Sequence, residues 1–103
     1  MYLDNNIKEI IKNRIYEKIN PEKIILFGSY AYGTATDESD IDIMVVENKL
    51  LNSKVKEAIN IKKILEEIKK SKDIIVLSKE EFEFYKTEAG SVVREAYERG
   101  EVL

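Results

Sequence analysis

The 103-residue chain contains no cysteine and no histidine, and these two absences narrow its chemistry. Without cysteine there are no disulfide bonds and no thiol redox role, which suits a cytoplasmic protein. Without histidine, neither imidazole acid–base catalysis nor a zinc site built on imidazole is available. Carboxylates are therefore the only credible catalytic groups in this sequence.

Positive charge is also scarce, since 17 Lys and Arg face 20 Asp and Glu for a formal net charge of −3. A domain that grips a nucleic-acid backbone usually carries a basic surface, so direct nucleic-acid binding is not expected. Lysines do cluster around one predicted helix end, where they favour the helix dipole and solubility; contact with a partner or RNA is the alternative. They are Lys62, Lys63, Lys69, Lys70 and Lys72.

Long apolar runs are missing as well. The N-terminal segment has apolar residues at helical spacing from Leu3 to Ile19, ending before Asn20-Pro21, but it is interrupted by Lys8, Glu9 and Lys12. It is expected to be a covering helix and not a signal peptide or a membrane span.

Two short apolar runs flank the most informative segment. Residues 23–27 and 41–46 are rich in β-branched residues and end at Gly28 or at polar residues, which predicts strands. Asp40 and Asp42 stand two residues apart at the start of the second run, so they leave the same face of the sheet. Two carboxylates about 5 Å apart repel by about 3 kcal/mol at an effective dielectric near 20, so the pair is expected to bind a cation. Magnesium, usually held by one or two carboxylates plus water and phosphate oxygens, fits best.

Other motifs fit these residues poorly. An EF-hand would need Asp or Asn and then Gly where the chain has Met44 and Val45. Gly28 and Gly33 have the Walker spacing, but Thr34 stands where its lysine should be. The plainest alternative is a strand-connecting turn whose acids are merely solvated.

A third carboxylate follows from the predicted topology. Apolar residues between positions 54 and 71 predict a helix, and Asp73 opens a third apolar run that ends at Leu77. A strand–helix–strand unit normally forms a parallel crossover, which places Asp73 near Asp40 and Asp42. The short connection from Gly28 to residue 39 favours antiparallel pairing of the first two strands, which brings Gly28 and Ser29 to the same end. The helix stripe consists of Val55, Ala58, Ile61, Ile64, Leu65 and Ile68.

The C-terminal third predicts two further helical pieces, the first starting at Ser78 and the two separated near Gly90. Residues 48–53 are the only loose linker. The apolar contacts of these pieces are expected from Phe82, Tyr85, Val92, Val93, Ala96 and Tyr97, with a surface role in partner binding as the alternative for some.

Gly28-Ser29, a ten-residue spacer and Asp40-Ile41-Asp42 resemble the G-S-x10-D-x-D signature of the minimal nucleotidyltransferases, small relatives of the DNA polymerase beta catalytic fold. Asp73 matches the third carboxylate of that family, and residues 90–96 with 100–103 resemble its usual tail. The resemblance implies an α/β (α+β) fold: one domain over residues 1–103, with a mixed sheet of three to four strands and about four helices.

The resemblance also implies transfer of AMP from ATP to an acceptor hydroxyl. Gly28 and Ser29 would hold the β- and γ-phosphates, Asp40 and Asp42 would carry magnesium, and Asp73 would hold a second ion and act as general base. A chain of this length lacks an acceptor-binding helical domain, so the acceptor is expected on another protein. By likeness that partner is an RNA-cleaving toxin of the HEPN class, which this chain would silence as an antitoxin by adenylylating a tyrosine.

Two alternatives remain open. The chain could be a binding module that has weak or lost chemistry and neutralises a toxin by covering its active surface. The intact set of carboxylates favours the enzyme over this module. A stand-alone transferase for a small molecule is less favoured, because nothing in the sequence would hold the acceptor.

Overall fold

The computed structural model describes all 103 residues as a four-stranded sheet with helices on both faces. The helices are α1 (Asn5–Lys18), α2 (Ser29–Tyr32), α3 (Lys54–Ile64), α4 (Lys79–Tyr85) and α5 (Val92–Arg99). The strands are β1 (Lys23–Phe27), β2 (Ile41–Glu47), β3 (Lys72–Ser78) and β4 (Glu101–Val102). The predicted mixed α/β architecture is confirmed, with β4 and the short α2 as additions.

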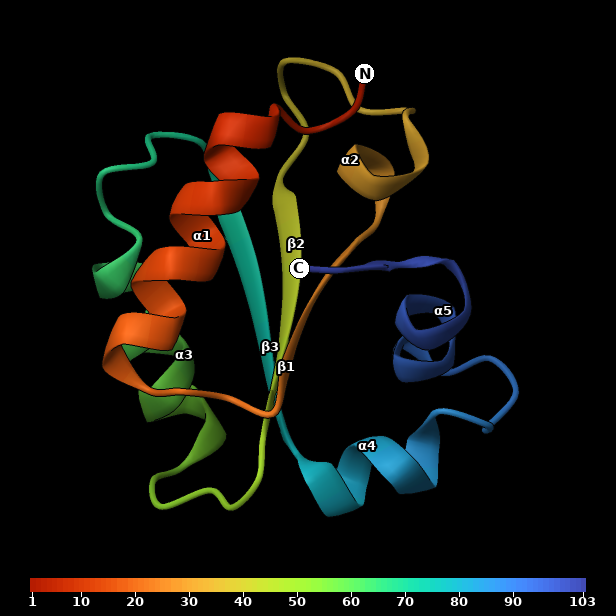
Figure 1. Cartoon of the computed structure of the whole chain (residues 1–103). Helices are drawn as coiled ribbons and strands as arrows, with labels where there is room; N and C mark the ends of the chain where they lie inside the picture. The colour runs from red at the N-terminus through yellow and green to blue at the C-terminus, as the bar shows by residue number, and fades with distance from the viewer.

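The sheet has the order β3-β2-β1-β4. β1 pairs with β2 and with β4 in the antiparallel sense, whereas β2 and β3 are parallel. Both expected pairings, antiparallel across the short connection and parallel across α3, are therefore confirmed. As a result, the end of β1 and the starts of β2 and β3 lie at one end of the sheet, at the top of Figure 1.

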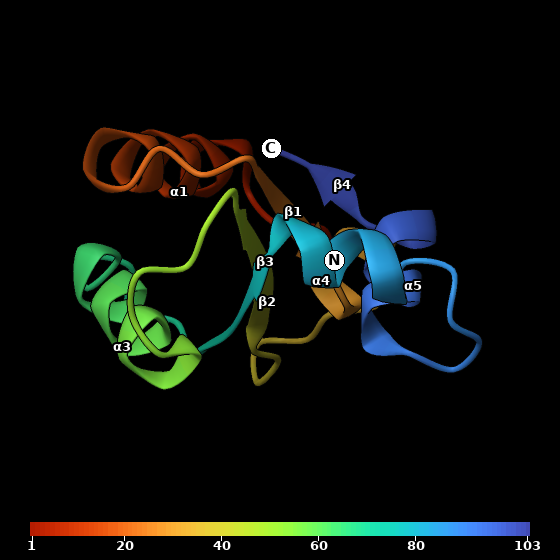
Figure 2. The same cartoon turned by 90° about the horizontal axis from the view of Figure 1, so that it is seen from below.

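Side chains alternate along the strands and build a separate core on each face. Figure 1 and Figure 2 show α1 and α3 on one face and α4 and α5 on the other. The first core joins Ile24, Leu26, Ile41, Ile43, Val45 and Val76 to Ile11, Ile15, Ile61 and Leu65 of the helices. The second joins Ile25, Phe27, Met44, Val46 and Leu77 to Phe82, Val93 and Ala96. Ile41 and Ile43 thus point to the α1 and α3 face, as expected, and Asp42 between them faces α4 and α5.

Serine side chains start three of the helices. Ser53, Ser78 and Ser91 each accept a hydrogen bond from a backbone N–H in the first turn of the helix that follows. At Ser78 the Glu81 side chain also accepts a bond from the Ser78 backbone N–H, which completes a capping box. The predicted start of the helix at Ser78 is confirmed.

The central helix is shorter than its apolar stripe. It ends at Ile64, and residues 65–67 form turns in which Ile68 N–H donates to Leu65 O at 3.0 Å. Ile68 is still buried, whereas Val55 at the other end is 70% exposed. The predicted extension of this helix to residue 71 is therefore wrong. The apolar stripe indicates which side chains are buried, but it does not indicate where the helical hydrogen bonds end.

The apolar and aromatic side chains of α4 and α5 are divided between the core and the surface. Phe82, Val93 and Ala96 are buried, as expected, but Tyr85, Val92 and Tyr97 are between 43% and 50% exposed. The surface alternative therefore holds for these three side chains, because each short helix can turn only one side toward the sheet. None of the helices has both the length and the apolar character needed to span a membrane.

Two neighbouring acids, one buried and one half-buried, lie at the far end of β2, at the bottom of Figure 1. Glu57, in the first turn of α3, is buried and accepts a bond from Asn60 Nδ2 at 3.2 Å. The Oε2 atom of Glu47 is buried without a hydrogen-bond partner. Burial, and then the adjacent Glu57 carboxyl, raise the pKa of Glu47 from 4.5 to about 7. Ionised Glu47 is therefore unfavourable in the folded chain.

The Glu47→Gln variant should be more stable than the wild type at pH 8 and equally stable at pH 4. As pH rises from 4.5 to about 7 the unfolded chain loses the Glu47 proton and the folded chain keeps it, so wild-type stability falls. The gain at pH 8 should be about 1 to 2 kcal/mol after allowance for solvent screening. Urea unfolding at both pH values measures it, with Glu66→Gln, an exposed acid beyond α3, as the control. Loss of stability in Glu47→Gln at pH 8 would contradict this assignment.

Candidate active site

The predicted site residues gather where β1 ends and where β2 and β3 begin. In the sheet register Asp42 is the neighbour of Phe27 on one side and of Asp73 on the other. Adjacent strands lie about 4.8 Å apart, and residues in register project on the same face, so Asp42 and Asp73 stand side by side toward α4 and α5. The sequence-based expectation that Asp73 reaches Asp42 therefore holds in the structure.

Gly28 lies directly against Asp42. A Cβ at Gly28 would be 3.0 Å from Asp42 Cγ and closer still to Oδ2. The backbone of Gly28 has φ 74° and ψ −162°, a region that is essentially restricted to glycine. It turns the chain from β1 into α2, where the Ser29 carbonyl accepts bonds from the N–H groups of Gly33 and Thr34, each at 3.0 Å. This tight turn leaves Ser29 at the mouth of the site and only partly buried.

The carboxylates of the site lack cationic partners. None of the six ion pairs in the molecule includes Asp40, Asp42 or Asp73. Burial raises the pKa of Asp42 from 3.8 to about 6, and the charges of Asp73, Asp40 and Glu95 add to the rise. Asp40 itself is exposed, just before β2. The site is thus an uncompensated patch of negative charge.

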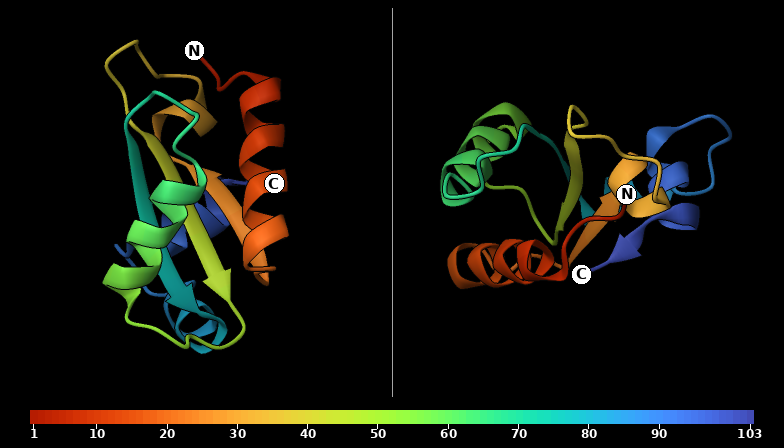
Figure 3. Two further views of the ribbon diagram at one scale, coloured as in Figure 1. Left: turned by 90° about the vertical axis from the view of Figure 1, so that its left-hand side faces the viewer. Right: turned by 90° about the horizontal axis from the view of Figure 1, so that it is seen from above.

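Glu95 is a fourth acid of the site that the sequence did not indicate. It lies on α5, and its charge raises the pKa of Asp42 and of Tyr32. Its position near Asp42 depends on how α5 packs across β1, which no local pattern encodes. Figure 3, right, shows the helix near the C-terminus (blue) beside the short helix that follows the first strand (orange).

The donor set suits a hard cation such as magnesium. It offers only carboxylate oxygens, two of them on register neighbours and uncompensated by any ion pair. The side chains are not drawn together into a cluster of three or more acidic ligands. Magnesium commonly uses one or two carboxylates and completes its octahedron with water and substrate phosphate oxygens, so the residues present fit it.

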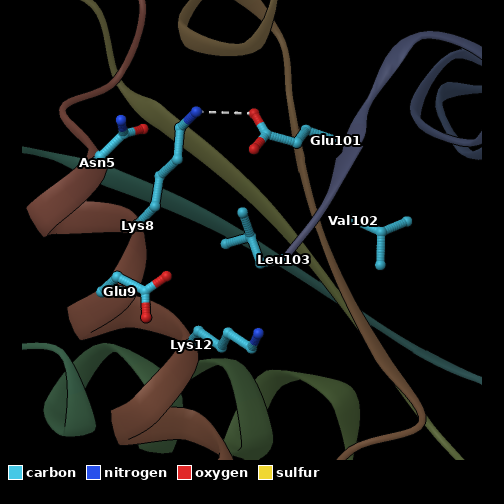
Figure 4. A pocket seen from close by; sticks show the side chains of 7 residues that line it. All are labelled: Asn5, Lys8, Glu9, Lys12, Glu101, Val102 and Leu103. Carbon is cyan, nitrogen blue, oxygen red and sulfur yellow. Dashed lines mark hydrogen bonds and ion pairs between the residues drawn. The ribbon is translucent and has the colours of Figure 1, made fainter.

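A different hollow, of about 220 Å³, lies on the far side of β1, between α1 and β4. Figure 4 shows Lys8 and Glu101 joined across it by a 2.8 Å ion pair. Its lining is completed by Asn5, Glu9, Lys12, Val102 and Leu103. None of the predicted site residues lines it, and Glu101 in its lining is paired with Lys8. The Lys8–Glu101 ion pair across this hollow connects α1 to β4.

Comparisons with known proteins show which family the chain resembles. The chain is 50% identical over 44 residues to "Putative protein adenylyltransferase MJ1379" of Methanocaldococcus jannaschii, a match over 40% of this chain and 44% of that protein. It is 52% identical over 42 residues to "Putative protein adenylyltransferase MJ0604" of the same organism, over 41% of this chain and 36% of that one. The matched part thus spans less than half the length of these curated relatives.

A solved structure extends the likeness to almost the whole fold. The crystal structure of a putative nucleotidyltransferase from Sulfolobus solfataricus superimposes with a TM-score of 0.57 at 26% sequence identity, covering 92% of this chain and 73% of that one. The sequence model of the nucleotidyltransferase domain family matches residues 5–103, which include every residue of the candidate site. The chain therefore belongs to the nucleotidyltransferase domain family.

Proposed function

We propose that this chain transfers AMP from ATP to a hydroxyl group of a partner protein. The observation that carries the proposal is the placement of Asp42 and Asp73 as register neighbours on one face of the sheet, with Gly28 against the Asp42 carboxylate. Family membership supports the nucleotidyl transfer, and the names of the archaeal relatives support a protein as the acceptor.

The residues divide the work as follows. The turn at Gly28 and Ser29 holds the β- and γ-phosphates of ATP. Asp40, Asp42 and Asp73 would hold magnesium, which would supply positive charge against the phosphoryl group and help to orient the substrate. Asp73 takes the proton of the acceptor hydroxyl as its oxygen bonds to the α-phosphorus. The bond from that phosphorus to the bridging oxygen breaks, and pyrophosphate leaves.

The proposed acceptor is a tyrosine of a HEPN-class toxin, which makes the chain an antitoxin. We place the acceptor on a partner protein because no hollow in this fold has Asp40, Asp42 or Asp73 in its lining, so none would hold a small acceptor beside these acids. Exposed aromatic side chains, Phe84 at 62% and Tyr97 at 50%, lie on α4 and α5, on the face that carries Asp42. Such residues are enriched where proteins bind one another.

Intact-mass analysis of a co-expressed HEPN toxin tests the proposal directly. The toxin should gain whole AMP units in the presence of this chain, and peptide mapping should place them on tyrosine. An unmodified toxin that forms a stable complex with the chain would favour the binding module. That second function is supported by the same exposed aromatic surface, which could cover a partner without chemistry.

Nucleotide binding should depend on magnesium. ATP with magnesium should raise the melting temperature by several degrees, since a ligand at about 100 times its Kd adds about 2.7 kcal/mol of stability. ATP with EDTA should do much less, because four phosphate charges would then meet uncompensated carboxylates. Differential scanning fluorimetry with and without EDTA measures the two shifts. Equal shifts would point to a pocket that does not use the metal.

A further inference from the structure

An arginine from the C-terminal helix is stacked on the turn of the site. The guanidinium carbon of Arg99, the last residue of α5, lies 3.9 Å from the centre of the Tyr32 ring. Tyr32 is the last residue of α2, and its N–H donates to the Gly28 carbonyl at 3.1 Å. Arg99 thus contacts a side chain whose backbone is hydrogen-bonded to Gly28, the glycine next to Asp42.

The surroundings of Tyr32 place its hydroxyl inside the site. The hydroxyl is buried and has no partner at normal hydrogen-bonding geometry. Burial raises the pKa of Tyr32, and Glu95 adds to the rise, while the Gly28 backbone and the charge of Arg99 act against it. Both Gly28 and Glu95 are therefore close neighbours of this ring, and Glu95 also acts on Asp42. Tyr32 therefore has both Arg99 and Glu95 as neighbours.

The charge of Arg99 is not paired with an acid in the folded chain. It takes part in none of the six ion pairs, whereas Arg94, one turn earlier on α5, is bonded to Glu98 at 3.0 Å. A guanidinium stacked by its flat face keeps its N–H edges free to bond. Arg99 lines a hollow of about 280 Å³ along α5, together with Arg94 and Glu95, and no hydrophobic residue lines it.

We propose that Arg99, held in place by the ring of Tyr32, binds the terminal phosphates of the nucleoside triphosphate. The inference rests on the proposed function and adds a binding residue to it. The site has four acids, Asp40, Asp42, Asp73 and Glu95. Arg99 lines the same hollow as Glu95 and lies over the Tyr32 ring, which makes it a cation at the edge of the site. A triphosphate needs positive charge at its far end as well as at the metals, and a guanidinium fork suits phosphate oxygens.

The Arg99→Gln variant should bind ATP and inorganic tripolyphosphate about tenfold more weakly than the wild type, a loss of about 1.4 kcal/mol. Its affinity for AMP should change less than about twofold, because AMP lacks the terminal phosphates. Isothermal titration with magnesium present measures all three ligands. The melting temperature should stay close to that of the wild type, since Arg99 is exposed. Arg14→Gln, on α1 at the opposite face of the sheet and paired with Glu67 at 2.8 Å, is the control and should bind all three ligands normally.

Two variants of Tyr32 test the supporting ring. Tyr32→Phe keeps the ring and should bind tripolyphosphate as the wild type does, whereas Tyr32→Leu removes the ring and should repeat the loss seen in Arg99→Gln. Circular dichroism shows whether each variant is folded. Unchanged tripolyphosphate binding in Arg99→Gln would overturn the inference. So would equal losses for ATP and AMP with a lowered melting temperature, which indicate a structural role. A wild type that binds neither ATP nor tripolyphosphate would overturn the proposed function and this inference with it.

Discussion

Replacing Asp42 by Asn should reduce nucleotidyl transfer by roughly a hundredfold to a thousandfold and leave the metal-free fold at least as stable as the wild type. Asp42 has Asp73 beside it in the sheet register, and burial, followed by the charges of Asp73, Asp40 and Glu95, raises its pKa to about 6. An ionised carboxylate there is unfavourable in the folded chain at neutral pH, so an amide of the same shape removes a repulsion. The expected gain is about 1 kcal/mol once solvent screening is allowed for.

Transfer of labelled AMP and urea unfolding in EDTA at pH 7.5 measure the two effects. Glu38→Gln is the control, because Glu38 is an exposed acid in the connection that precedes Asp40 and takes part in no ion pair. It should leave both quantities unchanged. Marked loss of stability in Asp42→Asn, or transfer at the wild-type rate, would count against a catalytic role for this carboxylate.

The same variant separates the two functions proposed for the chain. If silencing of the toxin requires adenylylation, cells that carry the toxin with Asp42→Asn should be poisoned even though the variant is folded. If silencing works by masking, they should grow, because the exposed aromatic residues on α4 and α5 are untouched. The carboxylates and the aromatic surface lie on one face of the sheet, so partner binding and chemistry are expected to be coupled in the wild type.

The sequence could place Asp42 beside Asp73 because the inference used only local patterns and a topological rule. Short apolar runs rich in β-branched residues predicted the strands within a residue of their ends, and the helix between the second and third runs implied a parallel pair. The ten-residue connection after Ser29 implied the antiparallel pair. Each step depended on residues near one another in the chain, where hydrophobic period and loop length carry the information.

The parts that were missed depend on contacts between distant segments. The strand β4 has only two residues and exists because Glu101 and Val102 pair with β1. The helix α2 has four residues, too few to show a helical period, and it is fixed by the turn at Gly28. Glu95 and Arg99 enter the site through the angle at which α5 crosses the sheet. Neither the residue types nor their spacing along α5 predicts how that helix packs against the sheet.

Replacing Gly28 by Ala should damage both the fold and the site. The backbone at φ 74° and ψ −162° is strained for any residue with a Cβ, and the new methyl group would overlap the Asp42 carboxylate. Strain and overlap together should lower the free energy of unfolding by about 3 kcal/mol. Asp42 can escape only by turning away from Asp73, so transfer by the folded fraction should fall about a hundredfold.

Gly90→Ala is the matched control for this effect. Gly90 also has a positive φ, of 79°, but no atom lies within 4 Å of the position its Cβ would take. This variant should lose only the conformational term, about 1 to 2 kcal/mol, and retain wild-type transfer. The difference between the two variants in urea unfolding therefore isolates the overlap with Asp42. Equal losses of stability, together with equal activity, would mean that Gly28 serves the turn alone and that its closeness to Asp42 is not required for the chemistry.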